Sequence, residues 1–169
     1  MSARKSYVRV VMAVQGNAPC LRVLITRLKV LIDQGSSTNV LYWSTFQKLG
    51  LPTSSLEECS ETLFRFIGER VEIRGIMEIE IVFGVGASAR TILVSYKMVN
   101  TWASYNIVIR WSTLNRLRVA VSTPHLCMKY PIGKGVGVIK ADKKITYRCY
   151  EKSLRVGRRL VDYEGPSNS

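Results

Sequence analysis

The sequence has few of the residues that bind metals or form disulfides. It contains one histidine, His125, and four cysteines that lie far apart: Cys20, Cys59, Cys127 and Cys149. A zinc knuckle or finger needs several thiol and imidazole ligands at short spacing, and no C-x-x-C pair occurs here. We therefore expect no metal site and no cofactor. We expect the cysteines to be reduced thiols, most of them buried.

Long apolar runs are also missing. No segment approaches the roughly 20 apolar residues that a membrane helix needs, and Arg9 interrupts the apolar stretch at 8–14. That stretch also lacks the continuous apolar core and the cleavage site of a signal peptide. We expect an intracellular, cytoplasmic chain that makes no membrane contact.

Acidic residues are few compared with basic ones. The chain has 25 Lys and Arg against 12 Asp and Glu, a formal net charge of +13. Many of the basic residues crowd the C-terminal stretch: Lys140, Lys143, Lys144, Arg148, Lys152, Arg155, Arg158 and Arg159. Such a surplus favours polyanions through counterion release, although no RNA-recognition aromatic motif accompanies it. The pattern predicts either a non-specific RNA contact through this stretch or a charged face that only solvates the chain.

Strand signals dominate the sequence. From 71 to 83 apolar and charged residues alternate, which predicts a long strand with one buried face and one wet face. Gly75 interrupts the alternation and predicts a bend or bulge. The small, glycine-containing segment 84–89 predicts a hairpin connection to a returning strand over 92–98. Shorter alternations at 8–14 and 21–25, and apolar runs at 30–32 and 119–121, predict further strands.

Two segments predict short helices. Ser44 can cap the first, which would bury Phe46 and Leu49 and end at Gly50. Ser112 or Thr113 can cap the second, with Leu114 and Leu117 on its inner face. From about Tyr150 large apolar residues are few, so the pattern predicts a weakly ordered tail.

The segment from Val30 to Leu41 carries the strongest chemical signal. Asp33 ends an apolar strand, and Gly35, Ser36 and Ser37 follow it at once. An isolated Asp-x-Gly predicts no more than a turn, because both residues are common in turns. Here the apolar residues before the acid and the new apolar run after the serines favour an active-site loop.

This loop resembles the active-site loop of retropepsin-like aspartic proteases. More narrowly, residues 30–50 resemble the protease segment of plant gypsy-type retrotransposon Gag-Pol polyproteins. Three further segments match the same pattern: 64–70 at the flap position, 104–115 next to the active-site loop, and 122–131 at the strand that closes the domain. The resemblance extends over about 21–154, most of the chain.

The resemblance implies a mainly β fold, a retropepsin-like closed β-barrel with a flap hairpin and one or two short helices. It implies three parts: an N-terminal arm with a strand pattern at 1–18, the protease domain at 19–133 and a basic C-terminal extension or linker at 134–169. It makes Asp33 the catalytic residue, Gln34, Gly35 and Ser36 the active-site loop, and Phe66, Ile67 and Gly68 the flap tip that closes over the substrate.

One such loop per chain implies a homodimer. Water attack on a peptide carbonyl needs a base and an acid, and two carboxylates that share one proton supply both. No second loop of this kind occurs, because neither Asp142 nor Asp162 precedes a matching Gly. Each subunit would therefore give one Asp33, and the substrate would be a polypeptide, the chain's own polyprotein. Gly35 would let the partner loop approach closely, and Ser36 would hydrogen-bond and orient the carboxylate.

Five residues depart from the family pattern. Gln34 stands where a Ser or Thr hydroxyl helps to lock the two loops together. Arg65 and Arg110 stand at glycine positions, Trp111 at an arginine position and Ser112 at a proline position. A large cation at Arg110 beside Asp33 would crowd the loop and oppose a shared proton. Two alternatives to an active endopeptidase therefore stay open: a catalytically inactive, degenerate protease-fold module for dimerisation or interaction, and a basic RNA-binding β-domain.

Overall fold

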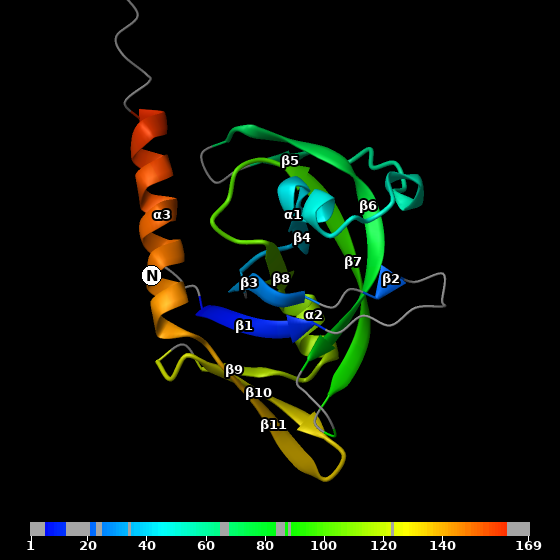
Figure 1. Ribbon diagram of the computed structural model, residues 1–169, viewed down its shortest axis with the longest axis vertical. Coiled ribbons are helices and arrows are strands. Elements are labelled where there is room, and N and C mark those ends of the chain that lie inside the picture. The colour runs from blue at the N-terminus through cyan, green and yellow to red at the C-terminus, as the bar shows by residue number, and fades with distance from the viewer. Residues whose placement is uncertain are drawn as a thin grey trace, which may run out of the picture.

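A computed structural model gives the fold of the chain. It describes residues 6–12, 21–22, 25–33, 35–64, 68–83, 87, 89–122 and 124–161. This part is mainly β, with an eight-stranded sheet, a three-stranded sheet and three α-helices. The large sheet curls so that its long strands arch around the first helix (Figure 1). The expected mainly β class is confirmed, and it includes one helix more than expected.

The large sheet brings together strands from both halves of the chain. Its order is β1 (Ser6–Met12), β3 (Ile25–Asp33), β8 (Ile107–Arg110), β4 (Val40–Tyr42), β7 (Arg90–Asn100), β6 (Arg70–Phe83) and β2 (Leu21–Arg22), with β5 (Leu63–Phe64) paired to β6. β3 and β8 run parallel to each other, and β4 lies antiparallel to β8 on its other side. The strand β1 within the predicted N-terminal arm is thus an edge strand, paired antiparallel with β3.

The predicted strand at 71–83 and its returning partner form the long antiparallel hairpin β6–β7. The pairing shifts register between Ile73 and Gly75, and Gly75 has a φ of +148°. A Cβ added there would lie 2.8 Å from the carbonyl oxygen of Glu57. Glu57 and Ile76 exchange backbone hydrogen bonds of 2.9 Å at this point. Gly75 therefore forms the predicted bulge, and it allows a second segment to lie against β6.

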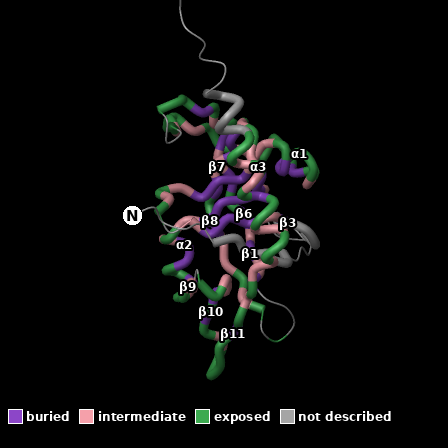
Figure 2. Tube along the Cα trace, turned by 90° about the vertical axis from the view of Figure 1, so that its left-hand side faces the viewer, coloured by how far each residue is buried: buried purple, intermediate pink, exposed green. Residues whose placement is uncertain are grey.

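The core lies inside the curl of the large sheet. Buried residues concentrate along β6, β7 and β8 (Figure 2). The main cluster includes Ile32, Leu41, Phe46, Ile81, Phe83, Tyr96, Met98, Ile107, Ile109, Leu114 and Leu117. Each fully buried aliphatic side chain contributes about 1.5–3 kcal/mol to folding. The strand that ends at Asp33 is thus anchored by its own buried residues.

Both expected short helices are present. They are α1 (Trp43–Lys48) and α2 (Trp111–Arg116). The 3-10 turn η1 (Thr53–Ser55) follows α1. Phe46 and Leu114 are buried on their inner faces, as expected.

The expected caps of these helices are wrong. Both helices start directly at the end of a strand, with Tyr42 and Arg110 as N-cap residues and no side-chain cap hydrogen bond. Ser44 and Ser112 lie inside the first turns instead. The strands β4 and β8 set where the helices begin, because the sheet fixes the last strand residue in an extended conformation.

The C-terminal part differs from the expected weakly ordered tail. β9 (Ala120–Ser122), β10 (Cys127–Ile132) and β11 (Gly135–Lys140) form the three-stranded sheet, and α3 (Lys143–Val161) follows. The β10–β11 hairpin crosses the predicted boundary between 133 and 134. The division of the chain into three parts stays a prediction.

Helix α3 is capped and docked. The carboxylate of Asp142 accepts hydrogen bonds from the amides of Lys144 and Ile145, at 2.9 and 3.1 Å. Cys149 is buried, and its carbonyl accepts a 2.9 Å hydrogen bond from the hydroxyl of Ser104. These contacts explain why a segment with few large apolar residues is helical. None of the helices in the described part is long and apolar enough to cross a membrane.

Candidate active site

Asp33 is the last residue of the buried strand β3. Val30 and Ile32 before it are 1% and 2% exposed, whereas Asp33 is partly exposed. The parallel register of β3 and β8 pairs Asp33 with Arg110. The acid is thus presented to solvent from a rigid strand end, with an arginine as its neighbour in the sheet.

Backbone groups of the following loop hold Asp33. The amide of Gly35 donates a 3.1 Å hydrogen bond to the Asp33 carboxylate, and the amide of Ser36 donates a 3.3 Å bond to the Asp33 carbonyl. The Ser36 hydroxyl does not take the expected place on the carboxylate. It donates to the carbonyl of Thr38 at 2.9 Å and accepts from the Thr38 amide at 3.3 Å. Ser36 therefore shapes the loop, while Gly35 orients the acid; Gln34 lies outside the described residues.

Arg110 covers one side of this loop. Its guanidinium donates a hydrogen bond to the carbonyl oxygen of Ser37. The Nε atom of Arg110 is buried and has no hydrogen-bond partner among the described residues. Next to it, the Trp111 side chain is 52% exposed. The guanidinium of Arg110 thus contacts the loop that follows Asp33, and an exposed indole comes next in the chain, where the family pattern has a small residue and an arginine.

Asn39 is a positioning residue that the sequence analysis did not single out. It is 5% exposed, and its carbonyl oxygen accepts hydrogen bonds from the amide of Arg110 (2.9 Å) and the hydroxyl of Thr113 (3.0 Å). Its amide group donates to the carbonyl of Ser95 at 3.3 Å. Asn39 therefore ties the end of the Asp33 loop to α2 and to β7. A polar residue directly before the apolar pair Val40-Leu41 is the signal that marks it.

A short hairpin stands at the expected flap position. β5 and β6 pair antiparallel, with Leu63 opposite Val71 and Phe64 opposite Arg70. Gly68 in the connection is exposed and has a φ of +83°, a conformation that favours glycine. Phe66 and Ile67 of the predicted flap tip, and Arg65, lie outside the described residues. Their roles stay predictions.

The fold is similar to that of a solved retroviral protease-like domain. The retroviral protease-like domain of Ddi1 from Leishmania major matches with a TM-score of 0.53 and 14% sequence identity, over 82% of this chain and 93% of that domain. A retropepsin-like aspartic protease from Rickettsia conorii matches with a TM-score of 0.38 and 12% identity, over 82% of this chain and 94% of that one. No family model and no curated protein sequence matches the chain. The likeness to the Leishmania domain shows a retropepsin-like aspartic protease fold.

Proposed function

We propose that this chain is an aspartic endopeptidase domain that hydrolyses peptide bonds as a homodimer. The observation that carries the proposal is the placement of Asp33. Its carboxylate lies at the solvent-exposed end of a buried strand and is oriented by the amide of Gly35, within a retropepsin-like fold. A carboxylate fixed in this way is pre-organised for proton transfer.

The chemistry needs a second carboxylate. One ionised Asp33 takes a proton from a water molecule as the water attacks the peptide carbonyl, and the protonated Asp33 of a second copy gives its proton to the carbonyl oxygen. Two carboxylates a few ångströms apart share one proton because both cannot be ionised at once. A symmetric dimer supplies this pair from one loop per chain.

The remaining assignments follow from the sequence resemblance. Phe66, Ile67 and Gly68 form a flap tip that excludes water from the bound peptide. The substrate is the polyprotein of a plant gypsy-type retrotransposon, in which 19–133 is the protease domain between an N-terminal arm and a basic extension. The chain acts in the cytoplasm.

Cleavage by the purified chain tests the proposal. Wild type and Asp33→Asn are incubated at acidic to neutral pH with a diverse peptide library, and the products are sequenced by mass spectrometry. Sedimentation measures the oligomeric state of both proteins. We expect cleavage by wild type only and a dimer for both. No cleavage by either protein, with the dimer retained, would instead identify an inactive dimerisation module.

A further inference from the structure

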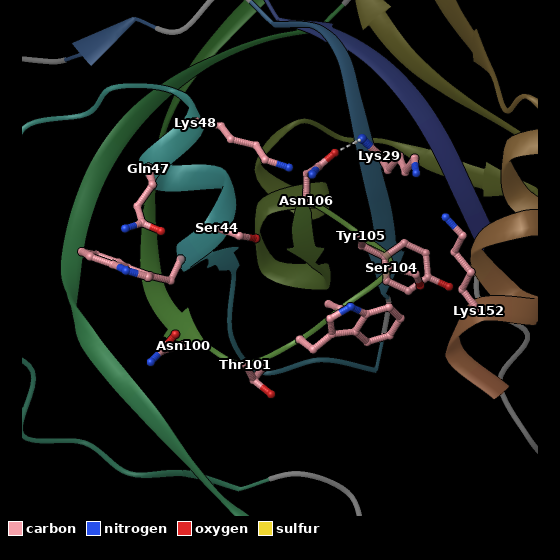
Figure 3. A pocket seen from close by; sticks show the side chains of 13 residues that line it. Lys29, Ser44, Gln47, Lys48, Asn100, Thr101, Ser104, Tyr105, Asn106 and Lys152 are labelled. Atoms are coloured by element: carbon pink, nitrogen blue, oxygen red, sulfur yellow. Dashed lines mark hydrogen bonds between the residues drawn. The ribbon is translucent and has the colours of Figure 1, made fainter. Parts of the chain in front are cut away.

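A cavity of about 550 Å³ lies away from the Asp33 loop. It opens between α1, the connection from β7 to β8, and α3 (Figure 3). Asp33 is not among the lining residues. The lining residue Lys29 lies on the same strand, β3, about 13 Å of extended chain before Asp33. The volume falls within the roughly 300–1,000 Å³ typical of small-ligand sites.

The charge of the cavity has one sign. Three lysines line it, each from a different element: Lys29 from β3, Lys48 from α1 and Lys152 from α3. No acidic residue is among the described lining residues. Lys48 reaches into the opening towards Asn106, and Lys152 stands on the opposite side (Figure 3). Ammonium groups that converge without a carboxylate between them attract an anion.

Hydrogen bonds fix the three walls relative to one another. The side chain of Asn106 accepts a 2.8 Å bond from the amide of Lys29 and donates a 3.0 Å bond to the hydroxyl of Thr45. Ser104 bonds to the carbonyl of Cys149 at 2.9 Å and to the hydroxyl of Ser153 at 2.7 Å, which holds α3 in place. The backbone positions of the three lysines are therefore fixed relative to one another by these hydrogen bonds.

The surroundings of the Cys149 thiol support the placement of Lys29 and Lys152 close to each other. Burial raises the pKa of Cys149, and the positive charges of Lys29 and Lys152 act in the opposite direction. Both charges thus act on one thiol, which lies behind the cavity lining and bonds to its residue Ser104.

An aromatic ring stands at the same opening. Trp102 lines the cavity and is 51% exposed. Sites for single-stranded nucleic acid combine a basic groove for the backbone with aromatic side chains for the bases.

We propose that this cavity binds a segment of single-stranded RNA, with phosphates on Lys29, Lys48 and Lys152 and a base stacked on Trp102. Lys152 belongs to the basic C-terminal stretch, for which a non-specific RNA contact is one of two expectations from the sequence. The cavity gives this contact a defined site. An acidic peptide would also meet the lysines, but carboxylate side chains offer no π-face to Trp102. The proposal is independent of Asp33 and of catalysis.

Fluorescence anisotropy of a labelled oligouridylate of about ten nucleotides tests it, at about 0.15 M salt. The cavity variant is Lys29→Gln, Lys48→Gln and Lys152→Gln together. The matched control is Lys129→Gln, Lys134→Gln and Lys140→Gln, which removes the same charge from exposed positions on β10, β11 and the turn between them. We expect the cavity variant to bind about tenfold or more weakly, and the control to change by about threefold or less.

Trp102→Leu gives a second, charge-neutral test. We expect a loss of about tenfold, the typical effect of removing one stacked base. Asp33→Asn should bind as wild type does. Equal losses in the two lysine variants, or unchanged binding by Trp102→Leu, would overturn the proposal. Competition by oligoglutamate as strong as by unlabelled oligouridylate would overturn it in favour of an acidic peptide.

Discussion

Asp33 and Arg110 are paired residues of two neighbouring parallel strands, β3 and β8. The sheet places them side by side, and the Arg110 guanidinium bonds to Ser37 of the same loop that carries the acid. The family pattern has glycine at the position of Arg110. The larger side chain therefore occupies space beside the Asp33 loop that a partner loop would need in the proposed dimer.

Replacement of Arg110 by glycine should therefore increase peptide cleavage. Arg110→Gly removes the cation and the contact with Ser37 and leaves the backbone hydrogen bond to Asn39 available. We expect kcat/KM to rise by about tenfold, or about 1.4 kcal/mol of transition-state free energy, because the two loops can then approach more closely. Arg110→Lys keeps a long side chain and should give no increase. An equal effect of the two substitutions would show that the size of the side chain at 110 does not limit activity.

Substitution of Gly35 distinguishes what the folding of a single chain requires from what dimerisation requires. A Cβ added there meets only Asp33 Oδ1, at 3.6 Å, which is ordinary contact. Gly35→Ala should thus change the free energy of unfolding by no more than about 0.5 kcal/mol in urea titrations. We expect the dimer dissociation constant from sedimentation to rise by about tenfold, because the added methyl group meets the partner loop.

Gly133→Ala is the control for Gly35→Ala, because it should change stability and leave dimerisation as it is. Gly133 lies in the β10–β11 turn with a φ of +52° and open space around it. Gly133→Ala should cost about 1–2 kcal/mol of stability through backbone strain and leave dimerisation unchanged. A Gly35→Ala protein that dimerises as wild type does would remove this loop from the proposed interface.

Asn39 should be important for stability. Asn39→Ala leaves the amide of Arg110 and the hydroxyl of Thr113 without their acceptor in a buried place. We expect a loss of about 2–4 kcal/mol in the free energy of unfolding. Thr113→Val removes one of these groups together with its need for a partner, so it should cost about 1 kcal/mol or less. Equal losses would mean that Asn39 acts only through Thr113.

Tyr96 predicts a pH dependence. It is fully buried, its hydroxyl has no hydrogen-bond partner among the described residues, and burial raises its pKa well above the usual 10.0. The unfolded chain therefore loses this proton first, and stability falls as pH rises above about 10. Tyr96→Phe should raise stability at neutral pH by about 1 kcal/mol and reduce the alkaline loss.

Urea titrations of the two proteins from pH 7 to 11 measure this difference. A Tyr96→Phe protein that is less stable than wild type at pH 7 would show that the hydroxyl has a favourable partner. Equal alkaline slopes would assign the loss to other groups.

The strands were predictable because their signal is local. The alternation from 71 to 83 corresponds to β6, and Gly75 marks its bulge, since burial on one face of a strand imposes a period of two. The apolar run before Asp33 predicts β3 for a different reason, because Val30, Leu31 and Ile32 are all buried and the strand is covered on both faces. Arg110 was placed beside Asp33 through the family resemblance, because nothing local in the sequence pairs β3 with β8.

The helix α3 was missed because its docking is not local. Its inward residues recur every fourth position, at Ile145, Cys149 and Ser153, and two of them are small. Cys149 and Ser153 are held by Ser104, which is 49 residues from Ser153 in the chain. The capping residue Asp142 was a local signal for this helix. The cavity lined by Lys29, Lys48 and Lys152 depends on the same long-range contacts. The sequence therefore indicated the charge of this cavity but not its shape.

Mixing of subunits tests the central claim most directly. Wild-type and Asp33→Asn chains are unfolded together, refolded in varied ratios and assayed for peptide cleavage at constant total protein. If each active site needs Asp33 from both chains, activity falls as the square of the wild-type fraction. A linear fall would place a complete site within one chain, and cleavage by the Asp33→Asn protein alone, or none by wild type, would contradict the account.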